Sequence, residues 1–202
     1  LKEQSFFIFF SELRVSNHFT KHIQPFTLNL NLMPRPDLTK VPEHFHKYIA
    51  HVKGDDLMNA LQKQTKSFTK LLSNIPKSKR DFRYAEGKWN IREVIQHIID
   101  AERVFIYRSL CFARKDTTPL PSFDENLYAE NSKSDKRKWK ELWNEFMAVR
   151  LSTLLLFASF DDEQLGTTGT ASGKEIQVLA LGFIIAGHAK HHELILKEKY
   201  LG

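Results

Sequence analysis

The stretch WNIREVIQHIIDAERVFIYRSLCFAR, residues 89–114, decides the fold class of this sequence. Its apolar residues recur every three or four positions, which is the period of an amphipathic α-helix. Asn90 is a good N-cap, and Glu93, three residues on, completes a capping-box pattern. The apolar residues that share one helix face with His97 are Val94, Ala101, Val104 and Phe105. The stretch therefore predicts a long helix, ending near residue 114, that carries one imidazole on an apolar stripe.

Helical periodicity continues on both sides of this stretch. Further helices are predicted over about 42–53, from Asp55 or Asp56 to Pro76, over about 135–160 and over about 174–200. The connector KDTTPLPSFDENLYAENSKS is rich in turn formers and long enough to cross the end of a bundle. In the next loop, the segment TTGTASG can extend briefly, but we expect no sheet there. The sequence thus predicts an all-α fold, a four-helix bundle with a short extra N-terminal helix and long inter-helix connectors.

The composition is that of an ordinary globular protein, with 42% hydrophobic and 27% charged residues among 202. A net charge of +6 raises the question of nucleic acid, but the basic residues are dispersed among acidic ones. The densest basic patch, KSDKRKWK at 133–140, is interpreted as the solvated start of a helix, with a phosphate-binding face as the alternative. Zinc-finger spacing, RNP-like aromatic motifs and glycine-rich phosphate loops do not occur, so we expect no nucleic-acid partner.

The single cysteine, Cys111, excludes an intramolecular disulfide framework and favours a reducing compartment, which predicts a cytoplasmic protein. Because it lies in an apolar helical run, Cys111 is interpreted as a small buried hydrophobic residue rather than a reactive thiol. The sequence holds no run of about 18 apolar residues, so we expect no membrane partner.

Residues 1–32 differ from the rest of the chain in their pattern of apolar and charged residues, and they show no sustained helical or strand period. Their apolar centre, FFIFF, is too short for a membrane span or a secretory signal core. Two interpretations are open: a poorly ordered N-terminal extension, or translated sequence upstream of a native start at Met33. The second is favoured, and the bundle domain is expected to comprise residues 33–202.

The segment GHAKHHELIL, residues 187–196, places three histidines in the predicted last helix. His188 and His192 are four positions apart, so their side chains stack on one helix face. The apolar residues on that face are Ile184, Ile185 and Ile195. His191 lies about 60° away by helical spacing and is expected to be the exposed one. Two imidazoles on an apolar stripe each need a polar partner, because burying an unpaired polar group is costly.

Together with His97, the pair His188 and His192 forms a candidate three-nitrogen site for a divalent ion, and zinc, nickel and iron(II) all accept imidazole. Separate core histidines are the alternative, because H-x-x-x-H alone is a weak motif. A zincin needs glutamate where Ala189 stands, and an inverzincin needs glutamate where His191 stands. The spacing therefore does not support a protease-type site, and it identifies no catalytic base.

Three segments carry a resemblance to a known family: RYAEGKWNIREVIQHIIDAERVFIYR, TPLPSFDENLYAE and ALGFIIAGHAKHHELILKEKYL. From Met33 to its end the chain resembles the DinB/YfiT-like family of four-helix-bundle metalloproteins, most closely a bacterial subgroup. In that family one histidine of the second bundle helix and an H-x-x-x-H pair on the fourth hold the metal. The resemblance therefore implies the metal ligands His97, His188 and His192. Some members look like thiol S-transferases, one is similar to a mycothiol-dependent isomerase, and many are described only as metal-dependent hydrolases.

The resemblance implies a metal-dependent transferase or hydrolase that activates a small thiol or water against a small-molecule electrophile or hydrolysable substrate. A stress-related role and a homodimer are also expected. The side chains expected near the metal are Asp100, Glu102, Arg103, Tyr107, Asp124 and Glu125. Such groups also form ordinary surface or inter-helix ion pairs. The rival hypothesis is a non-catalytic, metal-binding, stress-related bundle protein.

Overall fold

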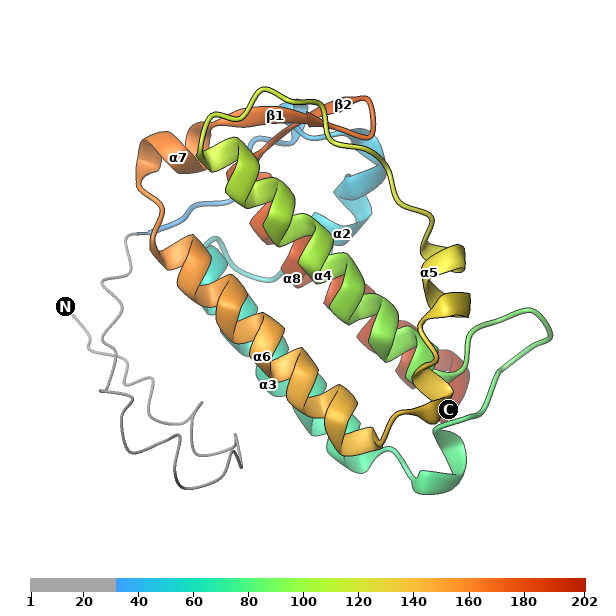
Figure 1. Cartoon of the computed structure of the whole chain (residues 1–202). Helices are drawn as coiled ribbons and strands as arrows, with labels where there is room; N and C mark the ends of the chain where they lie inside the picture. Colours follow the sequence, from blue (N-terminus) through green and yellow to red (C-terminus); the bar gives the residue numbers. More distant parts are fainter. Residues whose placement is uncertain (1–31) are drawn as a thin grey trace, which may run out of the picture. The chain divides into compact units, whose positions relative to one another are not determined.

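Four long helices form the body of residues 32–202, the part of the chain that the computed structural model describes (Figure 1). They are α3 (Leu57–Asn74), α4 (Ile91–Ala113), α6 (Trp139–Ala158) and α8 (Val178–Ile195). Helix α4 packs against α6 and α8, and α3 packs against the same two helices. The predicted four-helix bundle is confirmed. Cys111, near the end of α4, is partly exposed rather than buried as predicted.

Local capping explains where two of these helices begin. Asp56 caps α3 by accepting a hydrogen bond from the backbone N–H of Asn59 at 2.9 Å. At the start of α4, the Asn90 side chain accepts from the Glu93 backbone N–H at 2.9 Å, and the Glu93 carboxylate accepts from the Asn90 N–H at 2.7 Å. Both helix starts predicted from these residues are confirmed.

Helices α4 and α6 run in the same direction, and α3 and α8 run in the opposite one (Figure 1). The starts of α4 and α6 lie side by side, where the Arg92 guanidinium donates to the Arg137 carbonyl at 2.9 Å. The connector between these parallel helices must therefore return along the bundle rather than only cross its end. On the way it forms α5 (Glu125–Asn131) and a 3-10 turn (Ser134–Lys136), which the sequence did not predict.

A two-stranded hairpin lies across one end of the bundle, where β1 (Thr168–Ala171) pairs antiparallel with β2 (Lys174–Gln177) (Figure 1). The predictions that this segment makes no sheet and that the last helix starts near residue 174 are wrong. Ser172 and Gly173 have φ angles of 53° and 72°, so they form the two-residue turn with positive φ that suits a hairpin. The paired strand then delays the start of α8.

Short elements complete the described chain. They are the 3-10 turns Leu38–Lys40, Glu43–Phe45 and Lys77–Lys79, the helices α2 (His46–Ala50) and α7 (Asp162–Gly166), and a final π-helical turn, Leu196–Leu201. The helix predicted over about 42–53 is thus divided into a 3-10 turn and the short α2, which packs against α8. Within residues 32–202, no helix combines the length and the apolar character that a membrane crossing needs.

The expectations for residues 1–31 lie outside the described residues. The described chain is fixed to the bundle at Met33, which is only 2% exposed. The Met33 carbonyl accepts a hydrogen bond from the Leu57 N–H at 3.0 Å, and the Met33 N–H donates to the Asp56 carboxylate at 3.3 Å. The start of α3 therefore holds Met33 in place.

Candidate metal centre

Three histidine side chains meet between α4 and α8. His97 lies in the second turn of α4, and His188 and His192 lie on consecutive turns near the end of α8. Because α4 and α8 are antiparallel neighbours, the early part of one faces the late part of the other. The Nε2 atom of His188 lies 3.0 Å from Nε2 of His97 and 3.1 Å from Nε2 of His192. The structure therefore brings together the three histidines that helical spacing singles out.

Two of the three nitrogen separations match those between ligands of a single metal ion. One ligand atom from each ring can be chosen so that all three lie within 4.8 Å of one another. Two nitrogens bound to one zinc ion at about 2.0–2.1 Å are separated by about 2.9 Å at a right angle and by about 3.3 Å at the tetrahedral angle. The observed separations of 3.0 and 3.1 Å fall between these two values. Among the described residues, the cluster consists of imidazoles alone.

Burial keeps these imidazoles uncharged. His97 and His188 are 9% and 6% exposed, and His192 is half-buried. Burial lowers the pKa of His97 to about 4. Burial also lowers the pKa of His188 and of His192 well below the usual histidine value, and the neighbouring histidines add to this effect. Neutral imidazole is the form that binds a metal, because the ring nitrogen then keeps a lone pair.

Hydrogen bonds among the three rings cannot satisfy the cluster fully. The Nε2 atom of a neutral imidazole carries either a proton or a lone pair, and not both. The Nε2 of His188 faces two others. If it carries a proton, that proton must be divided between two acceptors; if it does not, one lone pair must serve two donors. A single cation that receives one lone pair from each ring removes this conflict.

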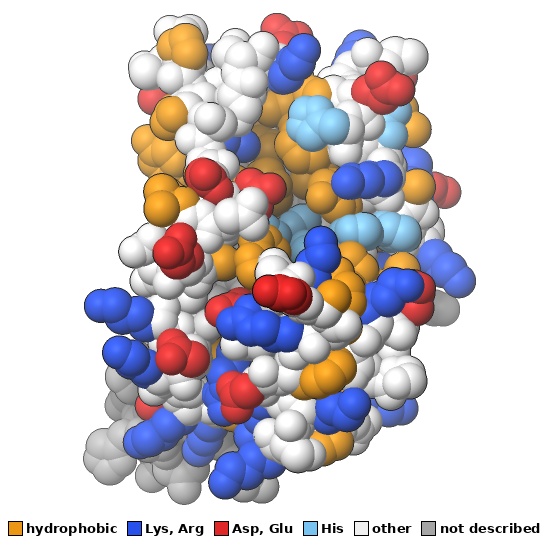
Figure 2. Space-filling model, turned by 90° about the vertical axis from the view of Figure 1, so that its right-hand side faces the viewer, with side chains coloured by type: hydrophobic (Ala, Val, Ile, Leu, Met, Phe, Trp, Pro, Cys, Tyr) orange, Lys and Arg blue, Asp and Glu red, His pale blue; other side chains and the backbone are white. Residues whose placement is uncertain are grey.

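Aromatic rings enclose the cluster. The ring centroid of Trp89 lies 4.7 Å from that of His97, and the centroid of Tyr48 lies 5.3 Å from that of His188. A β-carbon added at Gly187 would lie 2.0 Å from the Tyr48 carbonyl oxygen, so α2 can approach α8 only where residue 187 has no side chain. Figure 2 shows histidine side chains gathered at the edge of a hollow with a hydrophobic floor.

His191 is half-buried, so the prediction that it is the exposed histidine of the segment is wrong in degree. Its Nδ1 atom lies 3.3 Å from Nε2 of His51, and the two rings stack with centroids 5.4 Å apart. Burial lowers the pKa of His191, and His51 contributes. Sequence patterns assigned no role to His51 or Tyr48, and the only signal was the density of histidines in HFHKYIAH, residues 44–51.

Glu102 is predicted near the metal, but the structure buries it in an ion pair between α4 and α6. The Nε and Nη2 groups of Arg150 each donate to the Glu102 carboxylate at 2.8 Å, and the two residues are 0% and 2% exposed. Thr153 donates to the same carboxylate at 2.6 Å, and Arg150 donates to the Gln64 side chain, also at 2.6 Å. The two charges therefore balance each other inside the core.

The other five residues predicted near the metal are Asp100, Arg103, Tyr107, Asp124 and Glu125. Asp100 accepts a hydrogen bond from Gln96 at 2.9 Å, and Arg103 pairs with Glu145. Asp124 caps α5, and the remaining two are exposed. Within the described chain, no hydrogen bond or ion pair joins these side chains to the three imidazoles. Among the described residues, none of these carboxylates joins the three imidazoles in the group of potential metal ligands.

The fold and the cluster together define a class of protein: a four-helix bundle with one histidine on one helix and an H-x-x-x-H pair on another, arranged to suit a metal ion. The sequence profile of the DinB superfamily matches residues 60–196, from α3 to the first residue after α8. The chain therefore belongs to the DinB superfamily. A comparison with curated proteins gave no match.

Among solved structures, the chain is similar to YfiT from Bacillus subtilis, described as a probable metal-dependent hydrolase with an unusual four-helix bundle topology. The two sequences are 17% identical, the TM-score is 0.64, and the match covers 81% of this chain and 89% of that one. At this level of identity the likeness establishes the fold. The predicted resemblance to the DinB/YfiT-like family is thereby confirmed.

Proposed function

We propose that His97, His188 and His192 bind one divalent transition-metal ion, and that the protein is a metal-dependent enzyme acting on a small molecule. The observation that carries the proposal is the convergence of three Nε2 atoms, separated by 3.0 and 3.1 Å, in a buried place. Burying three imidazoles is unfavourable unless their nitrogens find partners. A shared cation supplies that partner.

The donor set limits which metal fits. Imidazole nitrogen suits zinc, nickel and iron(II), whereas calcium and magnesium prefer oxygen. Three protein ligands leave coordination positions open, as in catalytic rather than structural zinc sites. A metal held there would lower the pKa of a thiol or a water molecule that it coordinates, which produces a nucleophile near neutral pH. His97 and the α8 pair would hold the ion, and the aromatic rings of Trp89 and Tyr48 pack against His97 and His188.

A thiol is the favoured nucleophile. Among the described residues the cluster includes no carboxylate that could take a proton from water, and Ala189 stands where zincins carry glutamate. A thiol needs no such base, because coordination itself drives its deprotonation. The resemblance to thiol S-transferases points the same way. Hydrolysis is the second candidate, and the description of YfiT as a probable metal-dependent hydrolase favours it.

Cobalt(II) substitution tests this proposal, because the visible spectrum of cobalt(II) reports its ligands. Protein loaded with cobalt(II) should change its absorption when mercaptoethanol is added, since sulfur enters the coordination shell. The loaded protein should also accelerate conjugation of that thiol to an aryl halide. His188→Ala should abolish both effects, and the matched variant His191→Ala should keep them.

The outcomes separate the candidates. A spectrum that ignores a panel of thiols, together with turnover of an ester or amide, would favour the hydrolase. A cobalt-loaded protein that shows neither response would overturn the enzyme proposal and support the non-catalytic alternative. Full activity in a folded His188→Ala variant would remove the histidine cluster from the mechanism.

A further inference from the structure

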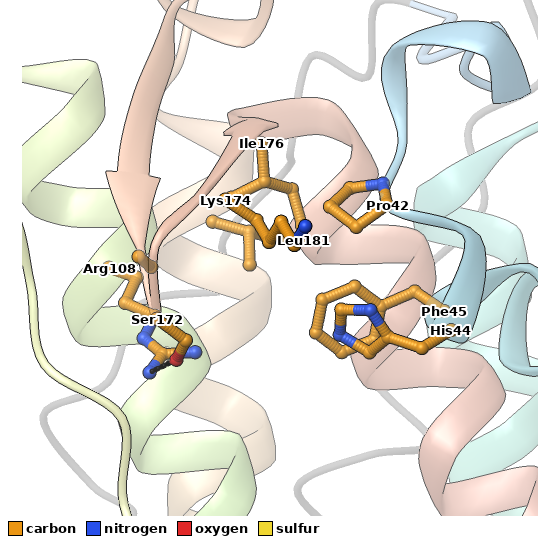
Figure 3. Close-up of a pocket in the computed structure, with 9 residues that line it drawn as sticks. Pro42, His44, Phe45, Arg108, Ser172, Lys174, Ile176 and Leu181 are labelled. Carbon is orange, nitrogen blue, oxygen red and sulfur yellow. Dashed lines mark hydrogen bonds between the residues drawn. The ribbon is translucent and has the colours of Figure 1, made fainter.

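A separate pocket opens between the hairpin and the turn before α2 (Figure 3). Arg108 of α4 lies on one side of it together with Ser172 of the hairpin turn. His44 and Phe45 lie on the opposite side, and Lys174 of β2 lies between the two sides. The residues that line this pocket include no aspartate or glutamate. The pocket therefore gathers basic groups without acidic ones.

Arg108 is the buried charge of this pocket. It is 5% exposed, and its Nη2 group donates to the Pro121 carbonyl at 2.8 Å and to the Ser172 hydroxyl at 3.1 Å. Both acceptors are neutral. Within residues 32–202, no carboxylate pairs with Arg108, and its Nε and Nη1 groups donate to no protein atom. A guanidinium has five N–H donors and cannot lose its charge in a protein, so burial leaves it in need of an anion.

Arg150, which is fully buried, shows how this chain satisfies such a charge when the role is structural. Arg150 donates to both oxygens of the Glu102 carboxylate, and it adds further bonds to neighbouring side chains. Arg108 is buried almost as deeply but receives no carboxylate from the described chain. Within the described chain, Arg108 therefore has only neutral acceptors.

Two further groups make the pocket suitable for an anion. Lys174 forms no ion pair with the described residues, and its ammonium group is exposed at the pocket. The pKa of His44 is lowered, mainly by partial burial and next by the charge of Lys174, which places the two groups in one electrostatic environment. An anion beside Arg108 would thus meet a second positive charge and a histidine side chain.

The pocket lies on the same helix face as the candidate metal centre. Arg108 follows His97 by eleven residues, which is three turns of α4, or about 16 Å along the helix. The ring of Phe105 lies between the two places: its centroid is 6.1 Å from that of Phe45 in the pocket and 6.0 Å from that of His188. Phe105 thus lies near one aromatic ring of each place.

We propose that this pocket binds the carboxylate or phosphate group of a small molecule, with Arg108 as the main partner and Lys174 as a second one. The chemistry common to both groups is an oxyanion that accepts hydrogen bonds from the guanidinium. The Ser172 hydroxyl and the Pro121 carbonyl hold the Arg108 side chain in position for it. This site uses none of the three metal-centre histidines, so the proposal does not depend on the binding of a metal.

Calorimetric titration of the metal-free full chain with inorganic phosphate, and separately with acetate, tests the site. Sodium chloride holds the ionic strength constant. Saturable binding of about one anion per chain is expected, and the tighter of the two probes identifies the preferred group. Arg108→Gln should raise the Kd at least about tenfold, because hydrogen bonds to charged groups are strong. Lys174→Gln should raise it about threefold, as expected for an exposed charge.

Lys140→Gln is the matched control, because Lys140 is exposed on α6 and away from the pocket residues. It should leave the Kd unchanged. If Arg108→Gln fails to fold, the comparison of Lys174→Gln with Lys140→Gln decides the question. No saturable binding of either anion, or an equal effect of the two lysine variants, would overturn the proposal. Since the metal is removed beforehand, failure of the metal proposal does not alter these results.

Discussion

Two buried polar clusters lie on helix α4, and they are built on opposite principles. Glu102 and Arg150 carry opposite charges, and the Arg150 guanidinium donates two hydrogen bonds to the Glu102 carboxylate. His97 meets His188 and His192, and these three identical groups direct their nitrogens to one place. The first cluster is complete as it stands. In the second, the Nε2 of His188 faces two other Nε2 atoms, a conflict that the proposed metal ion would remove.

Helix geometry allows both clusters on one helix. Five residues separate His97 from Glu102, which is a rotation of about 140° around the helix axis. The carboxylate therefore faces α6 while the imidazole faces α8. Buried polar groups in such a bundle can therefore be divided into two kinds. Balance within a cluster indicates a structural role, and convergence of like groups indicates a site for a partner.

Breaking the balanced cluster should have the largest effect on stability. Arg150→Met leaves the Glu102 carboxylate buried without its cation, so the free energy of unfolding should fall by about 3–5 kcal/mol. The matched control is Arg103→Met, which removes a half-exposed ion pair and should lower that free energy by less than about 1 kcal/mol. Urea unfolding measures both. Similar losses in the two variants would show that the Glu102–Arg150 pair is no more important than a surface pair.

Lowering the pH should reduce the free energy of unfolding through the histidine cluster, by a smaller amount that grows gradually. Burial depresses the pKa values of these imidazoles in the folded state, to about 4 for His97. The folded protein therefore keeps its full stability above the unfolded histidine pKa, about 6.5. The free energy of unfolding then decreases as the pH falls towards the folded pKa values. Each buried imidazole contributes up to about 1.4 kcal/mol per pH unit across that window.

Urea unfolding of the metal-free protein between about pH 7.5 and 5 measures this slope. His97→Leu removes one of the titrating groups. The slope of its free energy of unfolding against pH should therefore correspond to the uptake of about one proton fewer on unfolding. His46→Leu is the matched control, because His46 lies outside the cluster and its Nε2 contacts the Val41 carbonyl. A His97→Leu slope equal to that of the unaltered protein would mean that His97 is not held neutral by burial.

Local patterns in the sequence were enough for much of the bundle and for the placement of the histidines. The capping box of Asn90 and Glu93 involves residues three apart, so the start of α4 is visible in the sequence. The inward direction of His188 and His192 follows from their four-residue spacing on an apolar stripe. These features depend on neighbours along the chain, which a sequence displays directly.

Features that depend on distant contacts could not be predicted. Glu102 and Arg150 are 48 residues apart, so nothing local indicates that this carboxylate is neutralised in the core. The closeness of Tyr48 to His188 depends on an approach of backbones at Gly187. The hairpin is a different case, because the Ser-Gly pair at residues 172–173 is a turn signal that a closer application of local rules would have found.

The metal content of the purified protein tests the central claim most directly. Elemental analysis after zinc loading and desalting should find about one zinc ion per chain in the unaltered protein and in His191→Ala. It should find almost none in His97→Ala, His188→Ala or His192→Ala, because three ligands are needed to hold the ion. An unaltered chain that retains no zinc, or a His188→Ala variant that keeps it while His191→Ala loses it, would contradict the claim that these three converging imidazoles form a metal site.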